Sequence, residues 1–349
     1  MNLKISYSNL LDIINIHHKC YFPLKKFVSK QEFLSITNKY QIKKNQFFPI
    51  PIYFAISKKD FIKIKNYKKV KATYNNFKVC DLKISSIYTI NKRSLGLKIF
   101  KTSDKKHPGY NQFINSGDFF LNCSVKNFNK KIMKKINYSY PVKFKRNIKK
   151  LKIKSLVAFH TRNAPHKGHE WIHRFGLKKC GNLLIQPLIG QFKKGEFKEK
   201  TIIKTNKALI KENYKKQNVY FALFNSYPRY GGPREALLHA IVRRNYGCTH
   251  FLVGRDHAGI KNFYKKYESQ NECKKYEKKL KIKILNFNEP YLCMSCKMVM
   301  NKKCTHCTRS LKKLISGTYI RKKILQNKKI PNYYMSSNIS KILNKESII

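Results

Sequence analysis

Short apolar runs, separated by turn residues and by segments rich in lysine and asparagine, make up the first 140 residues of the chain. The clearest examples are the aromatic and β-branched runs 47–54 and 85–90. Runs of this length and composition between turn clusters are typical of β-strands. The pattern therefore predicts a mainly β domain over residues 1–140.

From about residue 150 the pattern changes to short apolar strands, each followed by a helical segment. The predicted strands are 156–159, 183–185, 219–224 and 251–253. Strands that alternate with helices form parallel sheets, so residues 141–290 are predicted to be an α/β domain. The stretch 136–150 is the expected linker, and residues 291–349 are expected to form a small third unit.

One helix of the α/β domain has both a start signal and a stop signal. Pro233 suits the first helical position, and Glu235 favours the positive N-terminal end of the helix dipole. Gly247 follows the last turn, where glycine commonly ends a helix. An apolar stripe lies between these signals: Leu237, Leu238, Ile241 and Val242. These signals predict a helix from Pro233 to Arg244.

The charge balance is extreme, because 76 Lys and Arg stand against 17 Asp and Glu, for a net charge of +59. A field of this size attracts polyanions whatever the protein does. The lysines are spread along the chain without the block that marks a basic arm, so compositional drift explains the charge better than a nucleic-acid site. Nine of the eleven arginines lie between Arg162 and Arg321, and forked guanidinium groups bind anions as lysine cannot. We therefore expect the functional residues to lie in the middle of the chain.

No stretch reaches the ~18 consecutive apolar residues of a membrane span, and the first residues lack the apolar core of a secretory signal. We expect a soluble cytoplasmic protein with no membrane partner. Six of the ten cysteines are scattered singly and are expected to be buried free thiols in a reducing compartment. They are Cys20, Cys80, Cys123, Cys180, Cys248 and Cys273.

A polar segment, 160–170, follows the strand 156–159 and opens a helix. Backbone N–H groups and the helix dipole favour an anion at such a junction. His166 and His169 are three residues apart and share one face, and Arg162 adds a forked cation beside them. An isolated pair of this kind is more often a metal ligand pair or two surface imidazoles. The neighbouring motifs favour a phosphate site instead.

The second polar cluster, 254–259, also follows a predicted strand. Its glycines let the backbone approach a nucleotide, and Arg255 and His257 offer donors for phosphate, although a turn with a surface ion pair is the structural alternative. Residues 190–196 have the glycine spacing of a P-loop but carry Glu196 where its lysine belongs. Histidine, arginine and backbone would then hold phosphate, which favours nucleotidyl transfer over P-loop hydrolysis.

The remaining cysteines, Cys293, Cys296, Cys304 and Cys307, form two C-x-x-C pairs close together in the sequence. This spacing is a strong signal for a tetrahedral metal site, most simply structural Zn²⁺, with iron as the less favoured alternative. Four unligated and exposed thiols would be prone to oxidation.

Several motifs stand along the chain in a fixed order. They are 161–163, 166–169, 232–240 and 254–259 in the middle, and 22–24, 49–52, 107–109, 116–118 and 316–321 with Pro331 outside it. Each motif alone is weak, but in this order they closely resemble the ATP sulfurylase (sulfate adenylyltransferase) family over essentially the whole chain.

The resemblance implies a PUA-like β-barrel domain, then a Rossmann-like nucleotidyltransferase domain of the H-x-G-H type, then a small zinc-bearing C-terminal subdomain. It implies that sulfate attacks the α-phosphorus of ATP, with Mg²⁺ on the phosphates, and reversibly gives adenosine 5′-phosphosulfate and pyrophosphate. Positioning and electrostatic stabilisation suffice for such a step, without a covalent nucleophile. Sulfate assimilation or sulfur metabolism and a homo-oligomeric state are further expectations.

The resemblance also assigns roles to residues. Catalytic roles would fall to Thr161, Arg162, Asn163, His166 and His169, of which the two histidines would stabilise the transition state. ATP would be held by His160, Arg162, Gly254, Arg255, Asp256, His257 and, beside adenine, Val299. Sulfate would contact His160, Arg162 and Ala258. Some prokaryotic family members use a histidine as the last zinc ligand, so His306 competes with Cys307.

The chain departs from the family at His160, where the family usually has glutamine. Imidazole can still donate a hydrogen bond, and a protonated ring would attract sulfate more strongly. We therefore expect retained activity with a sharper pH dependence between about 6 and 7.5, where an unperturbed histidine titrates.

Two other functions are compatible with parts of the sequence. An RNA-binding protein could use a PUA-like domain, a zinc knuckle and the positive charge, but the chain has no arginine-rich or aromatic-interleaved stretch. The sequence therefore favours no specific nucleic-acid partner. A homologue that keeps the fold without turnover is the other alternative.

Overall fold

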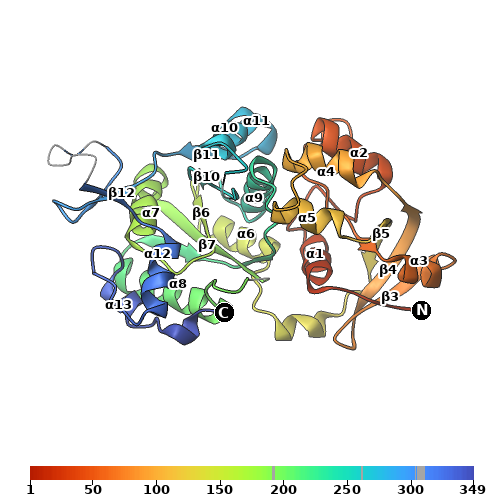
Figure 1. The fold of residues 1–349 in the computed structure, drawn as a ribbon, viewed down its shortest axis with the longest axis horizontal. Helices are drawn as coiled ribbons and strands as arrows, with labels where there is room; N and C mark the ends of the chain where they lie inside the picture. Colours follow the sequence, from red (N-terminus) through yellow and green to blue (C-terminus); the bar gives the residue numbers. More distant parts are fainter. Residues whose placement is uncertain (191–192, 261, 303, 305–310) are drawn as a thin grey trace.

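The computed structural model describes residues 1–349 except 191–192, 261, 303 and 305–310. Two bodies lie side by side along the long axis of the molecule, with the N-terminal one on the right in Figure 1. A small sheet projects from the opposite end, beside β12. Within the described ranges, no helix is both long and apolar enough to cross a bilayer.

The N-terminal body is built on a five-stranded sheet in the order β1-β3-β4-β5-β2. Its strands are β1 (Asn2–Lys4), β2 (Ala55–Ile56), β3 (Lys69–Tyr74), β4 (Phe77–Tyr88) and β5 (Phe119–Lys126). Asn75 and Asn76 join β3 to β4 with φ angles of 46° and 63°. Asparagine tolerates this left-handed backbone, which a tight two-residue hairpin turn requires.

The expectation of a mainly β domain is wrong for residues 1–140, because five α-helices surround the sheet. They are α1 (Tyr7–His17), α2 (Lys30–Lys39), α3 (Lys58–Ile64), α4 (Lys92–Phe100) and α5 (Pro108–Ile114). Each begins at a side chain that accepts a backbone N–H of the first turn: Ser6, Ser29, Ser57, Asn91 and His107. The predicted strand 47–54 contains no regular strand, since Pro49 and Pro51 remove ladder donors.

The expected linker is partly helical. It follows the 3₁₀-helix η1 (Lys130–Lys135) and contains α6 (Pro141–Lys150). Pro141 occupies the first turn of α6, where its fixed φ suits a helix. Ile148 of α6 is buried, so this connection packs against the protein.

A six-stranded sheet forms the second body, in the order β11-β10-β6-β7-β8 with β9 beside β7. Its strands are β6 (Val157–Thr161), β7 (Asn182–Gly190), β8 (Asn218–Phe221), β9 (Phe224–Ser226), β10 (His250–Val253) and β11 (Lys283–Asn286). All of these pairs are parallel, which confirms the α/β prediction. The single strand predicted at 219–224 is two strands, β8 and β9.

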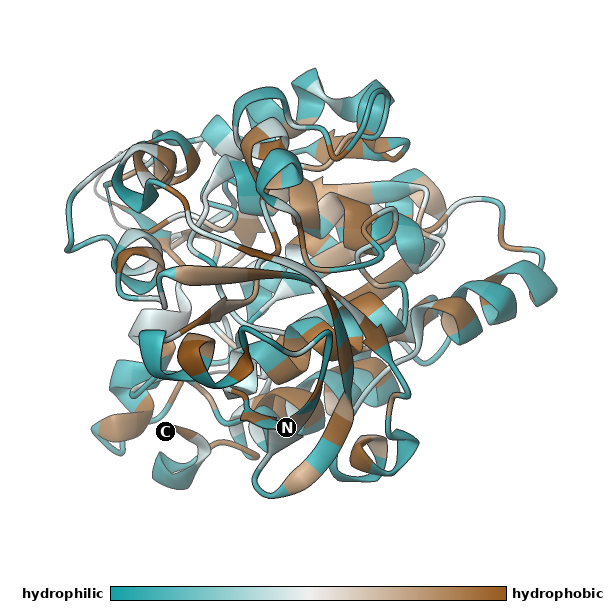
Figure 2. Cartoon of the chain, turned by 90° about the vertical axis from the view of Figure 1, so that its right-hand side faces the viewer, coloured by the Kyte–Doolittle hydropathy of each residue, from teal (hydrophilic) through white to brown (hydrophobic). Residues whose placement is uncertain are grey.

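Helices cover both faces of this sheet, since α9 packs with one set of strand residues and α7 and α8 pack with the alternate set. Figure 2 faces the N-terminal body, whose strands carry apolar residues while its helices carry many polar ones. The helices are α7 (Lys167–Cys180), α8 (Glu199–Asn213), α9 (Pro233–Asn245), α10 (Glu268–Lys275) and α11 (Glu277–Leu280). The helix predicted from Pro233 is confirmed as α9. Residues of α9 share one apolar core with the N-terminal body, which joins the two bodies through packed side chains.

The C-terminal part begins with a three-stranded sheet of β12 (Tyr291–Cys293), β13 (Val299–Met300) and β14 (Lys312–Leu314). It continues with α12 (Gly317–Leu325), α13 (Ser337–Ser340) and the 3₁₀-helix η3 (Lys345–Ser347). Ile320, Ile324 and Met335 belong to the same core as Ile185 of β7. Residues after β14 therefore pack against the α/β sheet. The division at 140 and 290 stays a prediction.

Candidate active site

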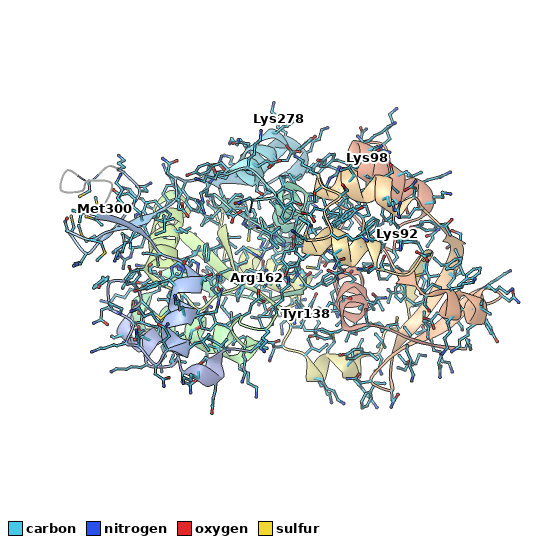
Figure 3. The ribbon with its side chains drawn as sticks, in the orientation of Figure 1. Lys92, Lys98, Tyr138, Arg162, Lys278 and Met300 are labelled. Carbon is cyan, nitrogen blue, oxygen red and sulfur yellow. The ribbon has the colours of Figure 1, made fainter. Side chains whose placement is uncertain are left out.

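The two predicted polar clusters follow neighbouring strands. β6 leads into the first cluster and β10 into the second, and these strands pair in parallel with Phe251 opposite Ala158. β7, the next strand in sequence after β6, lies on the other side of β6. The strand order therefore reverses beside β6, and open α/β sheets bind ligands at the carboxyl ends of strands at such a point. Figure 3 shows Arg162 near the middle of the molecule, between its two halves.

Two cavities of about 260 and 250 Å³ meet at this edge of the sheet. Four residues line both cavities and form the wall between them: His160, His169, Asp256 and His257. His166 and Arg255 also line the first cavity, and Arg162 lines the second. The segments 160–170 and 254–259 thus face one another across a shared space.

Most of the predicted ATP-binding, sulfate-binding and catalytic residues line one or both cavities. They are His160, Thr161, Arg162, Asn163, His166, His169, Gly254, Arg255, Asp256, His257 and Ala258. Val299 is the exception, because it lines neither cavity. It lies in β13, partly buried and paired opposite Leu292.

His166 and His169 act as one unit at the start of α7. Nδ1 of His166 accepts the backbone N–H of His169 at 3.3 Å, which makes His166 the N-cap of the helix, and the two rings stack 3.7 Å apart. Burial lowers the pKa of His166 to about 4 and that of His169 well below its usual value. Because Nδ1 of neutral His166 accepts, its proton must sit on Nε2. His166 therefore presents a donor and no charge.

His160 is also neutral, and this overturns the expected titration between about 6 and 7.5 in the free protein. Burial, followed by the charges of His239 and Arg243, holds the pKa of His160 well below its ordinary value. Nη2 of Arg243 donates to Nδ1 of His160 at 2.7 Å, and the rings of His160 and His239 stack at 4.4 Å. Burial likewise lowers the pKa of His257 to about 3.

Two charged partners of the site were missed by sequence reasoning. Arg162 forms an ion pair with Glu196, the residue that breaks the P-loop pattern. Nη1 of Arg321, from α12, donates to Oδ1 of Asn163 at 2.8 Å. An added Cβ at Gly317 would lie 2.7 Å from that same oxygen, so α12 approaches the site closely. The scarcity of arginine was the signal that could have identified Arg321.

The loop beside the second cavity is fixed by Glu235 and Asp12. The carboxylate of Glu235 accepts the backbone N–H groups of Arg229 and Gly231 at 2.9 and 3.0 Å. The guanidinium of Arg229 is paired with Asp12 of α1, and both side chains are buried. Tyr230 of this loop lines the second cavity. The N-terminal body therefore helps to shape the site.

Three of the four predicted metal ligands lie together at the C-terminal sheet. The Sγ atoms of Cys293, Cys296 and Cys304 are separated by 3.4, 3.7 and 3.5 Å. Four thiolates at ~2.3 Å from Zn²⁺ would stand about 3.8 Å apart, so these sulfurs fit three corners of a tetrahedral site. Cys307 and its competitor His306 lie outside the described residues.

Comparison with known proteins gives the chain a family. The family model described as ATP-sulfurylase matches residues 136–346, and the one described as PUA-like domain matches residues 1–130. A sulfate adenylyltransferase of Thermococcus onnurineus is 32% identical over 98% of this chain and 89% of its own. The enzymes of the same name from Carboxydothermus hydrogenoformans and Entamoeba histolytica are each 30% identical, over 92% and 84% of their own lengths.

A solved structure shares the fold. A hexameric APS kinase from Thiobacillus denitrificans superposes with a TM-score of 0.74 over 98% of this chain, at 14% sequence identity. The chain spans 62% of the length of that structure. The two family matches and this likeness confirm the predicted order of a PUA-like domain followed by a nucleotidyltransferase domain.

Proposed function

The chain belongs to the ATP-sulfurylase family, and from that premise we propose that it transfers the adenylyl group of ATP to sulfate where its two cavities meet. The products are adenosine 5′-phosphosulfate and pyrophosphate, and the reaction is reversible. The observation that carries this proposal is the shared wall of His160, His169, Asp256 and His257. Two substrates held on either side of one wall can meet with their reacting atoms adjacent.

ATP takes the first cavity. Gly254 follows β10 there and lets the backbone approach the nucleotide, while Gly168 lies in the first turn of α7, whose free N–H groups favour phosphate. Arg255 faces the same space and is paired with Glu289, with 3.3 Å between Nε and the carboxylate oxygen. A phosphate oxygen can replace that carboxylate as the partner of Arg255.

Sulfate takes the second cavity. Arg162 supplies forked donors, the backbone of Ala258 supplies an N–H, and His160 supplies a ring N–H. A sulfate oxygen in this position attacks the α-phosphorus of ATP, and pyrophosphate departs on the far side. The P–O bond to sulfate forms as the bond to pyrophosphate breaks, so no side chain has to act as a nucleophile.

The neutral histidines suit the transition state. His166 and His169 donate hydrogen bonds to oxygens on which negative charge builds. Their low pKa values keep them uncharged before ATP binds. The approach of the triphosphate favours the protonated form, so each ring can strengthen its contact as the reaction proceeds.

Mg²⁺ enters with the triphosphate as part of the substrate and neutralises charge on the phosphate oxygens. Asp256 and Glu289 are carboxylates that line the ATP cavity and offer the oxygen ligands that Mg²⁺ prefers.

A structural Zn²⁺ site is a separate part of the proposal. Cys293, Cys296 and Cys304 would supply three thiolates, and Cys307 or His306 would supply the fourth ligand. The ion would tie β12 to the segment after β13 and so stabilise a sheet that has little apolar core of its own. A zinc-containing prokaryotic type, a homo-oligomer and a cytoplasmic location remain predictions.

The direct test is ATP formation from adenosine 5′-phosphosulfate and pyrophosphate with Mg²⁺, followed by luminescence. Arg162→Met should abolish at least 90% of this activity, because it removes the forked donors that hold sulfate. Arg174→Met is the matched control, since Arg174 lies on the outer face of α7 with 68% of its side chain exposed. Absence of ATP, together with salt-resistant binding of a specific RNA, would favour the RNA-binding alternative.

A further inference from the structure

Arg243 is a buried guanidinium behind the wall that separates the two cavities. Its exposed fraction is 0%, and it lines neither cavity. Nη2 donates to Nδ1 of His160 at 2.7 Å, and Nη1 donates to the carbonyl of His239 at 3.3 Å. The guanidinium also lies over the ring of Phe224, 5.1 Å from its centroid. Arg243 therefore has no direct contact with substrate, and His160 is its hydrogen-bond partner that lines both cavities.

The bond from Arg243 determines where His160 carries its proton. A guanidinium has donors only, so Nδ1 of His160 must accept. A neutral imidazole has one ring proton, which must then sit on Nε2. Nε2 has no hydrogen-bond partner among the described residues and is not one of their buried unpartnered atoms. The Nε2–H group is therefore open to the cavities that His160 lines.

We propose that Arg243 is a positioning residue that makes His160 a donor without an acceptor, so that the site selects fully deprotonated tetrahedral dianions over hydrogen phosphate. This inference rests on the proposed function. Sulfate, selenate and molybdate offer only acceptors. Hydrogen phosphate keeps a hydroxyl proton that needs an acceptor, and one unmet hydrogen bond of this kind changes affinity about 5- to 30-fold.

Two other acceptors around the second cavity already have donors. The carboxylate of Glu235 accepts two backbone N–H groups, and Oδ1 of Asn163 accepts from Arg321. The carboxylate of Asp256 lines both cavities as well, with Oδ1 beside Gly259, and in the proposed function its oxygens would bind the Mg²⁺ that enters with ATP. Glutamine at position 160 would add an acceptor to the site, because its side-chain amide carries a carbonyl oxygen beside its N–H donors.

The same proton placement argues against a metal ion at the histidine cluster. Ring nitrogens of His160, His239 and His257 lie within 4.8 Å of one another and could in principle share an ion. Ligation by Nε2 of His160 would require its proton to move to Nδ1, where the N–H of Arg243 points. A buried guanidinium beside the cluster also repels a cation. An oxyanion fits this environment and a metal ion does not.

The tautomer can be measured on the unaltered protein. In ¹⁵N-histidine-labelled protein at pH 7, two-bond ¹H–¹⁵N spectra should show His160 with its proton on Nε2, assigned by the loss of that signal in His160→Gln. Addition of molybdate should perturb the Nε2 signal of His160 more than its Nδ1 signal. A proton on Nδ1, or rapid exchange between the two tautomers, would overturn the proposal.

Selectivity gives a second, independent readout. The ratio of the phosphate inhibition constant to the sulfate KM should fall about 5- to 30-fold in His160→Gln, because glutamine can accept the phosphate hydroxyl. His250→Gln is the matched control, since His250 lines neither cavity. An unchanged ratio in an active His160→Gln enzyme would refute the inference alone. A wild-type protein without turnover but with the Nε2–H tautomer would instead refute the proposed function.

Arg243 itself is tested by substitution in the wild-type protein and in the His160→Gln variant. Arg243→Lys keeps a cationic donor and should retain the tautomer and the selectivity, whereas Arg243→Met should lose both together. In the His160→Gln background, Arg243→Met should no longer change selectivity. Equal loss of selectivity in both backgrounds would contradict a route through His160. If the Arg243 variants do not fold, the spectra of the wild type and the kinetics of His160→Gln decide the question.

Discussion

The guanidinium of Arg162 is paired with the carboxylate of Glu196, and the charge of that carboxylate also acts on Arg321. The side chains of Arg162 and Glu196 are 25% and 24% exposed, so water reaches both partners. A sulfate ion that binds Arg162 must share it with Glu196 or displace that carboxylate. The ion pair therefore holds the arginine in place at some cost to the affinity for sulfate.

Glu196→Gln should lower the KM for sulfate about two- to fivefold, as expected for a partly exposed ion pair. The cause is the loss of a negative charge that competes with sulfate for Arg162. Initial rates at varied sulfate and saturating Mg²⁺-ATP measure the effect. Glu212→Gln, an exposed position on α8, is the control and should leave KM unchanged. A higher KM in Glu196→Gln would mean that Glu196 mainly positions Arg162.

His166 has two roles that separate in two substitutions. His166→Asn keeps an N-cap acceptor but removes the Nε2–H donor, so the free energy of unfolding should change by less than about 0.5 kcal/mol while kcat falls about 10²-fold. His166→Ala removes both functions and should cost about 1 kcal/mol of stability in addition. Urea unfolding and steady-state kinetics on the same preparations distinguish them. Normal kcat in His166→Asn would remove His166 from the catalytic set.

Stability should fall as the pH falls from about 6.5. Burial lowers the pKa of His166 to about 4, and the pKa values of His173 and His257 to about 3. The unfolded chain binds protons at these rings near the ordinary value of ~6.5, and the folded chain does not, so stability is full above 6.5 and is lost below it. Each ring contributes a slope of up to ~1.4 kcal/mol per pH unit.

Urea midpoints at pH 7.5, 6.5 and 5.5 test this expectation. The midpoint should be similar at the two higher values and lower at pH 5.5. The buried carboxyls Asp12 and Glu235 have pKa values raised by burial, so their protonation opposes this trend. His166→Asn should reduce the decline. A midpoint independent of pH down to 5.5 would contradict the neutral state of these histidines.

The cysteine cluster predicts about one equivalent of zinc per chain in protein purified without chelator. Cys304→Ser should reduce zinc below half an equivalent and lower the melting temperature. Turnover at low temperature should persist, since none of the described cysteines lines either cavity. Cys180→Ser, outside the cluster, should keep its zinc. Less than half an equivalent in the wild type would count against the site.

The sequence predicted the parallel sheet and α9 correctly because strong local signals determine them. Pro233 in the first turn and the apolar residues after it favour a helix, and the short apolar runs between turn signals favour strands. It failed for the N-terminal body, where α2 and α3 are short helices that begin after the N-caps Ser29 and Ser57. Capping residues were the available signal there.

The same distinction applies to the site: residues in motifs beside a strand could be predicted, and residues brought in by the tertiary fold could not. Arg162 and His257 belong to motifs that continue directly from strands, so the sequence could identify them. Glu196, Arg243 and Arg321 reach the site from elements that only the tertiary fold brings together. The expected titration of His160 failed for this reason, because its low pKa depends on burial and on Arg243.

The central claim is that sulfate attacks ATP directly across the shared wall of the two cavities, with no adenylylated side chain. Exchange of labelled pyrophosphate into ATP tests this claim most directly. The account predicts exchange in the presence of sulfate and none in its absence, since pyrophosphate leaves only when sulfate attacks. Exchange without sulfate would reveal a covalent intermediate and contradict the account, as would its absence at saturating sulfate.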